Sequence, residues 1–226
     1  MNNIISFSLW GDNPKYTIGA IENAKLQKTI YPDWKCRFYY DDSVPTNIIT
    51  LLSDLGSEVV YKPTNSQEFT GLYWRFEVGF DDTVDRFIIR DTDSRLNLRE
   101  KYAVDEWIDS KLPFHIMRDH RHHSIPILGA TWGATKNFIP TFKDVYNNWI
   151  INIPQSHHVR GDYFYTDQTF LSEHIWPLIQ NRHMAHDSHY NFSGHDKNFS
   201  FGLSNGLFVG QAYDVIDGKS IPQFVY

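Results

Sequence analysis

The chain has 226 residues, enough to bury the core of one domain. Its formal net charge of −6 argues against a broad electrostatic contact with nucleic acid. Cys36 is the only cysteine, which excludes an internal disulfide and a cysteine-cluster metal site. The N-terminus lacks the basic start of a signal peptide, and no apolar run is long enough to cross a bilayer. We therefore expect a soluble, cytoplasmic protein with no membrane insertion.

The first part of the sequence alternates between strand and helix patterns. Strand patterns cover 4–10, 34–40 and 57–61, and helix patterns cover 14–28 and 46–55. Asn13 as a cap and Pro14 at the first helical position mark the start of the first helix. This alternation predicts an α/β fold whose strands pair in parallel through right-handed crossovers.

The later part of the sequence carries fewer clear strands. Its predicted elements are a helix at 69–80, a strand at 86–89, a helix at 99–110, a strand at 114–117, a helix at 137–151 and a helix from Thr166 to near Pro177. Residues 155–162 read as a polar loop. The region after Pro177 is rich in His, Gly, Asn and Ser, and we expect an irregular C-terminal part there. No composition change marks a second domain, so we predict one domain over 1–226.

An acidic motif follows the apolar strand at 86–89. Asp91 and Asp93 are one residue apart, and in an extended segment residues i and i+2 point the same way. Both carboxylates would then face the edge where open α/β sheets bind ligands. Such a pair suits Mg²⁺ or Mn²⁺ together with substrate phosphates, and Arg90 and Arg95 would offset charge or bind phosphate oxygens. An exposed turn rich in Asp and Ser is the alternative.

Two glycine-containing segments are candidates for ligand contact. Leu9, Trp10 and Gly11 follow the first strand and would border the nucleotide cleft of a doubly wound sheet, although neither a dinucleotide fingerprint nor a Walker loop is present. In 129–134, glycines would allow close backbone approach, and Trp132 would stack on a sugar. An ordinary tight turn explains 129–134 equally well.

A histidine would complete the ligand shell of a divalent cation held by Asp91 and Asp93. Among eleven histidines, we favour His186, which lies in a polar segment beside Asp187, with His189 and His195 as alternatives. A surface histidine without a metal role remains the plainer interpretation.

A further carboxylate, Asp167, lies at the start of the predicted helix in Tyr165-Thr166-Asp167-Gln168. It is either a helix-capping acid or a general base that removes a proton from an acceptor hydroxyl. Asp119 and Asp162 are alternatives for the base.

Taken together, these stretches resemble the GT-A-fold glycosyltransferases, and more narrowly the small bacterial and large-DNA-virus (chlorovirus-type) members of that fold. The stretches that carry the resemblance are Ile5-Ser6-Phe7-Ser8-Leu9-Trp10-Gly11, Arg90-Asp91-Thr92-Asp93-Ser94-Arg95-Leu96, Phe114-His115-Ile116-Met117-Arg118-Asp119-His120, Pro126-Ile127-Leu128-Gly129, Thr166-Asp167-Gln168 and Phe208-Val209-Gly210-Gln211. The resemblance implies a Rossmann-like, mostly parallel sheet, with 1–95 as a nucleotide-binding half and 96–226 as an acceptor half. A virus-encoded chain would act in the host cytoplasm.

The resemblance also implies an activity and roles for residues. A sugar would pass from a nucleoside diphosphate, with UDP expected, to a hydroxyl of a glycan or glycoprotein. Asp91 and Asp93 would hold Mn²⁺ or Mg²⁺ on the diphosphate, Thr92 and Arg75 would face the donor, and His186 would complete the metal shell. Asp167 would activate the acceptor if the reaction inverts, whereas a retaining reaction needs no strong base there.

Three other functions remain open from the sequence. Phosphatases of the haloacid dehalogenase type also have Asp-x-Asp after a strand, but two positions after the second Asp they have Thr or Val, where this chain has Arg95. The aromatic content of 16% suits a non-catalytic carbohydrate-binding module, which would need no metal–diphosphate site. A nucleotidyltransferase usually carries a basic, glycine-rich first loop, which the segment after the first strand lacks.

Overall fold

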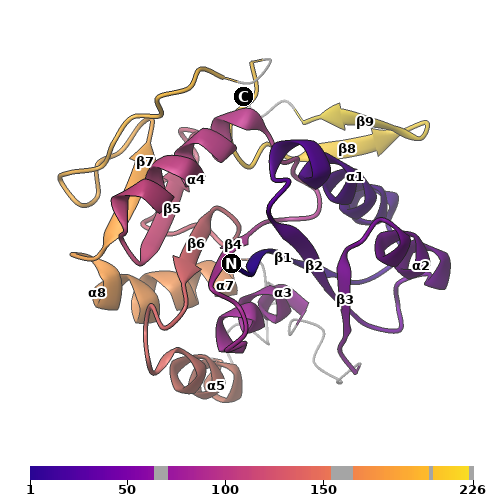
Figure 1. Ribbon diagram of the computed structural model, residues 1–226, viewed down its shortest axis with the longest axis horizontal. Helices are drawn as coiled ribbons and strands as arrows, with labels where there is room; N and C mark the ends of the chain where they lie inside the picture. The colour runs from indigo at the N-terminus through magenta and orange to yellow at the C-terminus, as the bar shows by residue number, and fades with distance from the viewer. Residues whose placement is uncertain (64–70, 154–164, 204–205, 224–226) are drawn as a thin grey trace.

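The computed structural model describes residues 1–63, 71–153, 165–203 and 206–223. A seven-stranded sheet in the order β3-β2-β1-β4-β6-β5-β7 forms the centre of the molecule (Figure 1). Its strands are β1 (Asn3–Leu9), β2 (Lys35–Tyr40), β3 (Glu58–Tyr61), β4 (Arg86–Ile89), β5 (Phe114–Arg118), β6 (Trp132–Thr135) and β7 (His183–Asp187). All pair in parallel except β6, which runs antiparallel to β4 and β5. The predicted α/β class with a mostly parallel sheet is confirmed.

Helices pack on both faces of this sheet. They are α1 (Pro14–Ile30), α2 (Thr46–Asp54), α3 (Gly71–Trp74), the 3₁₀ helix η2 (Arg75–Phe80), α4 (Leu98–Ser110), α5 (Phe142–Asn152), α7 (Thr166–Phe170), the π-helical turn η3 (Leu171–Ile175) and α8 (Trp176–Ile179). None of the helices in the described ranges is both long and apolar enough to cross a membrane.

The strands are apolar at successive positions because both faces of the sheet are buried. Ile5 and Phe7 of β1 pack with α1, α2 and α4 in one core cluster. Ile4 and Phe87 belong to a second cluster with η2, α5 and α7 on the opposite face. The alternation of side chains along each strand therefore builds two hydrophobic layers.

The strand order places a topological switch point between β1 and β4. The chain runs outward from β1 through β2 and β3 on one side, and β4 then pairs with β1 on the other side. Ligands of doubly wound sheets bind in the crevice at the carboxyl end of such a point. Leu9 ends β1 and Asp91 follows β4, so both predicted segments lie at this edge.

The prediction of an irregular tail after Pro177 was wrong for β7. The strand reads His-Met-Ala-His-Asp and has no apolar run, yet all five residues are buried. Its polar side chains find partners inside the protein: His183 Nδ1 lies 3.0 Å from the Ile179 carbonyl oxygen, and Asp187 is paired with Arg118 at 2.5 Å. A strand that is satisfied in this way shows no hydrophobic pattern in the sequence.

The C-terminal part also contains a hairpin that the sequence interpretation missed. Strands β8 (Tyr213–Ile216) and β9 (Lys219–Pro222) pair antiparallel across Asp217 and Gly218, which have φ of 51° and 72°. Asp-Gly is a common two-residue hairpin turn because both positions need positive φ. Figure 1 shows the hairpin beside α1.

Three predicted helices differ from the observed ones. The helix predicted from Thr166 to near Pro177 is divided into α7, η3 and α8 and ends at Ile179. The described part of 69–80 is divided into α3 and η2, and the helix predicted from Asn137 begins only at Phe142. Asn137 has φ of 57°, and Pro140 lies before the helix, so neither fits a continuous α-helix. The loop predicted at 155–162 lies outside the described residues.

Helix α1 packs against the segment that contains the acidic pair. Asn23 donates from Nδ2 to the Ser94 carbonyl at 2.8 Å, and its Oδ1 accepts from the Leu96 N–H at 3.0 Å. One turn earlier, a Cβ on Gly19 would lie 2.0 Å from the Thr92 carbonyl oxygen. The absence of a side chain at Gly19 therefore lets α1 lie directly on the turn.

We predict that Gly19→Ala destabilises the fold by about 1–3 kcal/mol, because the added methyl group overlaps main chain that cannot move away cheaply. Gly202→Ala is the matched control, since a Cβ there meets nothing within 4 Å. Urea unfolding of both variants tests this. Equal midpoints for the two variants would show that α1 does not depend on this contact.

Candidate active site

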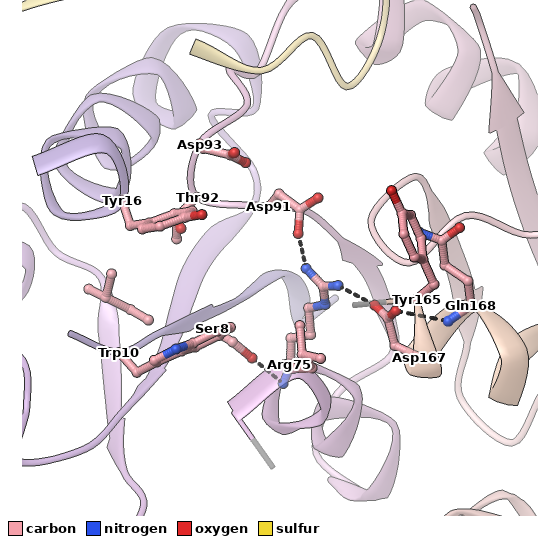
Figure 2. Close-up of a pocket in the computed structure, with 12 residues that line it drawn as sticks. Ser8, Trp10, Tyr16, Arg75, Asp91, Thr92, Asp93, Tyr165, Asp167 and Gln168 are labelled. Atoms are coloured by element: carbon pink, nitrogen blue, oxygen red, sulfur yellow. Dashed lines mark hydrogen bonds and ion pairs between the residues drawn. The ribbon is translucent and has the colours of Figure 1, made fainter. Parts of the chain in front are cut away.

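A cavity of about 210 Å³ lies at the carboxyl ends of β1 and β4 (Figure 2). It draws its walls from β1, α1, α3, η2, the turn after β4 and the start of α7. The lining residues are Ser8, Leu9, Trp10, Tyr16, Leu72, Arg75, Asp91, Thr92, Asp93, Tyr165, Asp167 and Gln168. The structure thus brings together most of the site residues that the sequence predicts.

Asp91 and Asp93 both line the cavity, but on a turn rather than an extended strand. The Ser94 N–H and hydroxyl donate to the Asp91 carbonyl oxygen at 3.3 and 2.9 Å. The Asp91 side chain is 48% exposed and that of Asp93 is 17% exposed. Burial, and next the charge of Asp91, raise the pKa of Asp93. The two carboxylates are therefore close enough to repel each other.

Each of these carboxylates already contacts a cation of the protein. Lys15 Nζ lies 2.9 Å from Asp93 Oδ2, and the Arg75 guanidinium donates to Asp91 Oδ1. Arg75 also donates from Nη2 to Asp167 Oδ2 at 2.8 Å, so it bridges two acids across the cavity (Figure 2). Three carboxylates and two cations leave this cluster with one net negative charge.

The backbone of Arg75 is fixed by strand β1. Ser6 Oγ donates to the Arg75 carbonyl at 2.7 Å, and the Arg75 N–H donates to Ser8 Oγ at 3.0 Å. The small polar residues that alternate with apolar ones in β1 thus hold η2 in place. The Arg75 side chain is only 6% exposed, which keeps its guanidinium inside the site.

Asp167 stands opposite the acidic pair, and its side chain is as buried as that of Arg75. Burial raises the pKa of Asp167, and the charge of Arg75 opposes that shift. Its Oδ1 accepts from the Gln168 N–H at 2.8 Å. A Cβ on Gly129 would lie 2.2 Å from Asp167 Oδ2, so the predicted close backbone approach at Gly129 occurs here, against a protein carboxylate.

Of the two competing carboxylates, only Asp119 is described, and it does not line this cavity. Asp119 is held by the Arg99 guanidinium through two contacts of 2.7 Å and lines a different cavity. Asp162 lies outside the described residues.

Two residues predicted to bind the nucleotide sugar lie away from the cavity. Trp132 in β6 is fully buried, and its ring stacks on Phe114 at 5.2 Å between centroids, so it cannot stack on a ligand. Arg90 is 1% exposed and its Nε lies 3.3 Å from Glu100 Oε1. Arg90 thus points into the protein, whereas the next residue, Asp91, lines the cavity.

The structure does not bring His186 to the acidic pair. His186 lies in β7, separated from β4 by β6 and β5, an interval of about 14 Å at the usual strand spacing. Its Nδ1 is 2.9 Å from His115 Nε2 and its Nε2 is 3.2 Å from Glu106 Oε2, so both ring nitrogens are engaged. His189 and His195 do not line the cavity either.

The acidic pair suits a hard divalent cation only in combination with a ligand. Over the described ranges, no group of three or more His, Cys, Asp or Glu side chains is placed to hold a metal. Mg²⁺ and similar ions are commonly held by one or two carboxylates, with waters and substrate phosphates completing the shell. Asp91 and Asp93 at the cavity wall fit that donor set.

Several lining residues were missed by the sequence interpretation. The missed lining residues are Ser8, Tyr16, Leu72, Tyr165 and Gln168. Ser8, Tyr165 and Gln168 lie within two residues of a predicted site residue, whereas Tyr16 and Leu72 do not. Gly11 was predicted to line the cleft, but it lies just outside, where its N–H donates to Ser43 Oγ at 2.7 Å.

No protein-family model matches the sequence, and no curated protein is significantly similar to it. Solved structures with a similar chain path include M. tuberculosis glucosyl-3-phosphoglycerate synthase, with 14% identity, a TM-score of 0.40 and coverage of 59% of this chain and 57% of that one. An active-site mutant of LgtC has 13% identity, a TM-score of 0.49 and coverage of 81% and 72%. Mouse xyloside xylosyltransferase 1 has 11% identity, a TM-score of 0.44 and coverage of 81% and 83%.

The chain spans little more than half the length of the glucosyl-3-phosphoglycerate synthase. A cytidylyltransferase from Leptospira borgpetersenii and a 4-diphosphocytidyl-2C-methyl-D-erythritol synthase from Anaerococcus prevotii occur among the similar structures as well. Likeness at this level does not identify a reaction, so function has to be argued from the cavity itself.

The buried histidines predict how stability depends on pH. Burial lowers the pKa of His115 and of His186 below the unfolded value of about 6.5. Both therefore contribute stability that is fully present above pH 6.5 and is lost as the pH falls below it, because only the unfolded chain takes up the protons. We expect the urea midpoint to fall between pH 7.5 and 5.5.

His186→Gln should reduce that fall, because the unfolded variant has one histidine fewer to take up a proton. His122→Gln is the control, since His122 is exposed, and it should keep the wild-type pH dependence. A folded His186→Gln variant with the wild-type pH dependence would contradict this account.

Proposed function

We propose that the protein is a metal-dependent glycosyltransferase that moves a sugar from a nucleoside diphosphate, with UDP expected, to a hydroxyl of a glycan or glycoprotein. The observation that carries the proposal is the shared cavity at the β1/β4 switch point, where Asp91 and Asp93 face Arg75 and Asp167. This position suits a nucleotide, and the paired carboxylates suit a cation on its diphosphate. The proposal covers 1–226 as one domain acting in the cytoplasm, that of the host if the chain is virus-encoded.

The cavity offers a separate group to each part of such a donor. Trp10 and Tyr16 supply aromatic faces for the base, and Trp10 is 40% exposed. A Mn²⁺ or Mg²⁺ ion held by Asp91 and Asp93 would supply Lewis-acid stabilisation of the leaving diphosphate. Arg75 lies between Asp91 and Asp167, where its guanidinium would bind phosphate or sugar oxygens.

Asp167 is placed to act as the general base for the acceptor hydroxyl. In an inverting reaction the acceptor oxygen forms a bond to the anomeric carbon, the bond from that carbon to the diphosphate breaks, and the acceptor proton passes to an Asp167 oxygen. The raised pKa of Asp167 makes it a better proton acceptor than an exposed aspartate. Arg75 holds the carboxylate in place for this step.

The other candidate functions fit the cavity less well. The loop of residues 9–12 has no basic residue to bind a nucleoside triphosphate, as a nucleotidyltransferase would need. A dehalogenase-type phosphatase needs a free nucleophilic Asp91, which here is paired with Arg75. A carbohydrate-binding module would not need three carboxylates around one cavity.

We predict that Asp91→Asn and Asp93→Asn each lower Mn²⁺-dependent UDP release from UDP-sugars by at least about 100-fold, because each removes charge stabilisation of the leaving group. Asp33→Asn, an exposed position in the loop after α1, is the control and should be neutral. Circular dichroism should show that both variants are folded, so that a lower rate does not reflect unfolding.

Three results would contradict the proposed glycosyltransferase function. Normal turnover in either variant removes the acidic pair from the reaction. Release of pyrophosphate from a nucleoside triphosphate indicates nucleotidyl transfer, and a phosphoaspartate trapped at Asp91 indicates phosphoryl transfer.

Asp167→Asn should lower kcat far more than it changes UDP and Mn²⁺ binding, because the proposed role of the side chain is on the acceptor. The wild-type rate should fall as the pH drops through the raised pKa of Asp167, and the variant should lose this acidic limb. Glu173→Gln, an exposed acid on η3, is the control. A variant with an unchanged pH–rate profile would assign Asp167 a structural role.

A further inference from the structure

We propose that Lys15 is a built-in counter-ion of Asp93 that competes with the divalent cation, so that the cation binds strongly only together with the nucleotide diphosphate. This inference rests on the proposed metal and nucleotide site, and it assigns to that site a coupling between its two ligands. Three features support this inference. They are the ion pair between Lys15 and Asp93, the packing of helix α1 on the acidic turn, and the net charge of the cluster.

The contact is short and sheltered. Lys15 Nζ lies 2.9 Å from Asp93 Oδ2, and the two side chains are only 22% and 17% exposed. A lysine side chain is protonated at neutral pH, because its ordinary pKa is about 10.4. The ammonium is therefore a lasting positive charge at the carboxylate, and a divalent cation arriving there meets its repulsion.

The packing of helix α1 keeps Lys15 close to Asp93. Lys15, Gly19 and Asn23 are four residues apart and share one face of α1. Gly19 and Asn23 fix that face on the turn that carries the acidic pair. The Asn13 side chain caps the helix by accepting from the Lys15 N–H at 2.9 Å. Lys15 can turn away from Asp93, but its helix cannot withdraw from the site.

Arg75 does not play the same part at Asp91. It is shared with Asp167 at 2.8 Å and is 6% exposed, so it keeps an acidic partner when Asp91 binds a cation. Within the described part of the chain, Lys15 forms an ion pair with Asp93, and Asp214 of β8 acts on it only through its longer-range charge. Lys15 is thus the cation left without its partner.

The charge balance then couples the two ligands. Asp91, Asp93 and Asp167 against Lys15 and Arg75 give one net negative charge at rest. A divalent cation alone turns this into one net positive charge. The diphosphate of a sugar nucleotide carries two negative charges and restores the resting value. Cation and nucleotide therefore favour each other, and removing Lys15 should weaken that preference.

The test is Mn²⁺ binding measured by electron paramagnetic resonance, with and without UDP. Lys15→Met should bind Mn²⁺ at least about fivefold tighter than wild type without UDP, the lower end of usual coupling effects. UDP should then strengthen Mn²⁺ binding less than it does in wild type. Lys15→Arg keeps the charge and should behave as wild type. Lys25→Met is the matched control, since Lys25 lies on the same helix and pairs with Glu22.

The outcomes separate this inference from the proposed function. If wild type binds Mn²⁺, Asp93→Asn loses it and Lys15→Met binds it no tighter, the metal site stands and the counter-ion role is overturned. If wild type binds no Mn²⁺ even with UDP, the proposed metal-dependent function is contradicted. The counter-ion role of Lys15 is then contradicted as well, because it depends on the metal site.

Discussion

Two carboxylates held side by side at one cavity repel each other, and much of the surrounding structure balances that repulsion. Asp93 is paired with Lys15 from α1, and Asp91 is paired with Arg75 from η2. Each cation is itself fixed, the first by the packing of α1 on the turn and the second by the serines of β1. The acidic turn is therefore a preformed arrangement that binding of a cation can use without refolding.

Strand order explains why these elements meet. The β1/β4 switch point brings the loop after β1 and the turn after β4 to one edge, and α1 begins directly behind them. The start of α7 closes the far side with Asp167, and Gly129 leaves room for its carboxylate. Residues 16 and 167 are far apart in the sequence, and both line one cavity because the sheet places their elements there.

The sequence predicted the elements whose patterns arise from burial. The alternation in β1 and the capped start of α1 have local causes, and the acidic pair follows an apolar strand. Strand β7 was not predicted because it is rich in polar side chains that have partners inside the protein. Asp187 pairs with Arg118, and His183 Nδ1 lies 3.0 Å from the Ile179 carbonyl oxygen. Sequence spacing also could not show that Trp132 belongs to the core, that Arg90 pairs with Glu100, or that His186 is engaged by His115 and Glu106. These contacts depend on the tertiary structure, because each is set by which strand lies next to which.

The most direct measurement is the anomalous scattering of manganese in crystals grown with Mn²⁺ and UDP. The account predicts one peak at the β1/β4 edge, about 2.1 Å from an oxygen of Asp91 and an oxygen of Asp93, with the diphosphate on its open side. A peak beside His186, or UDP bound in the cavity with no manganese between it and the two aspartates, would contradict it.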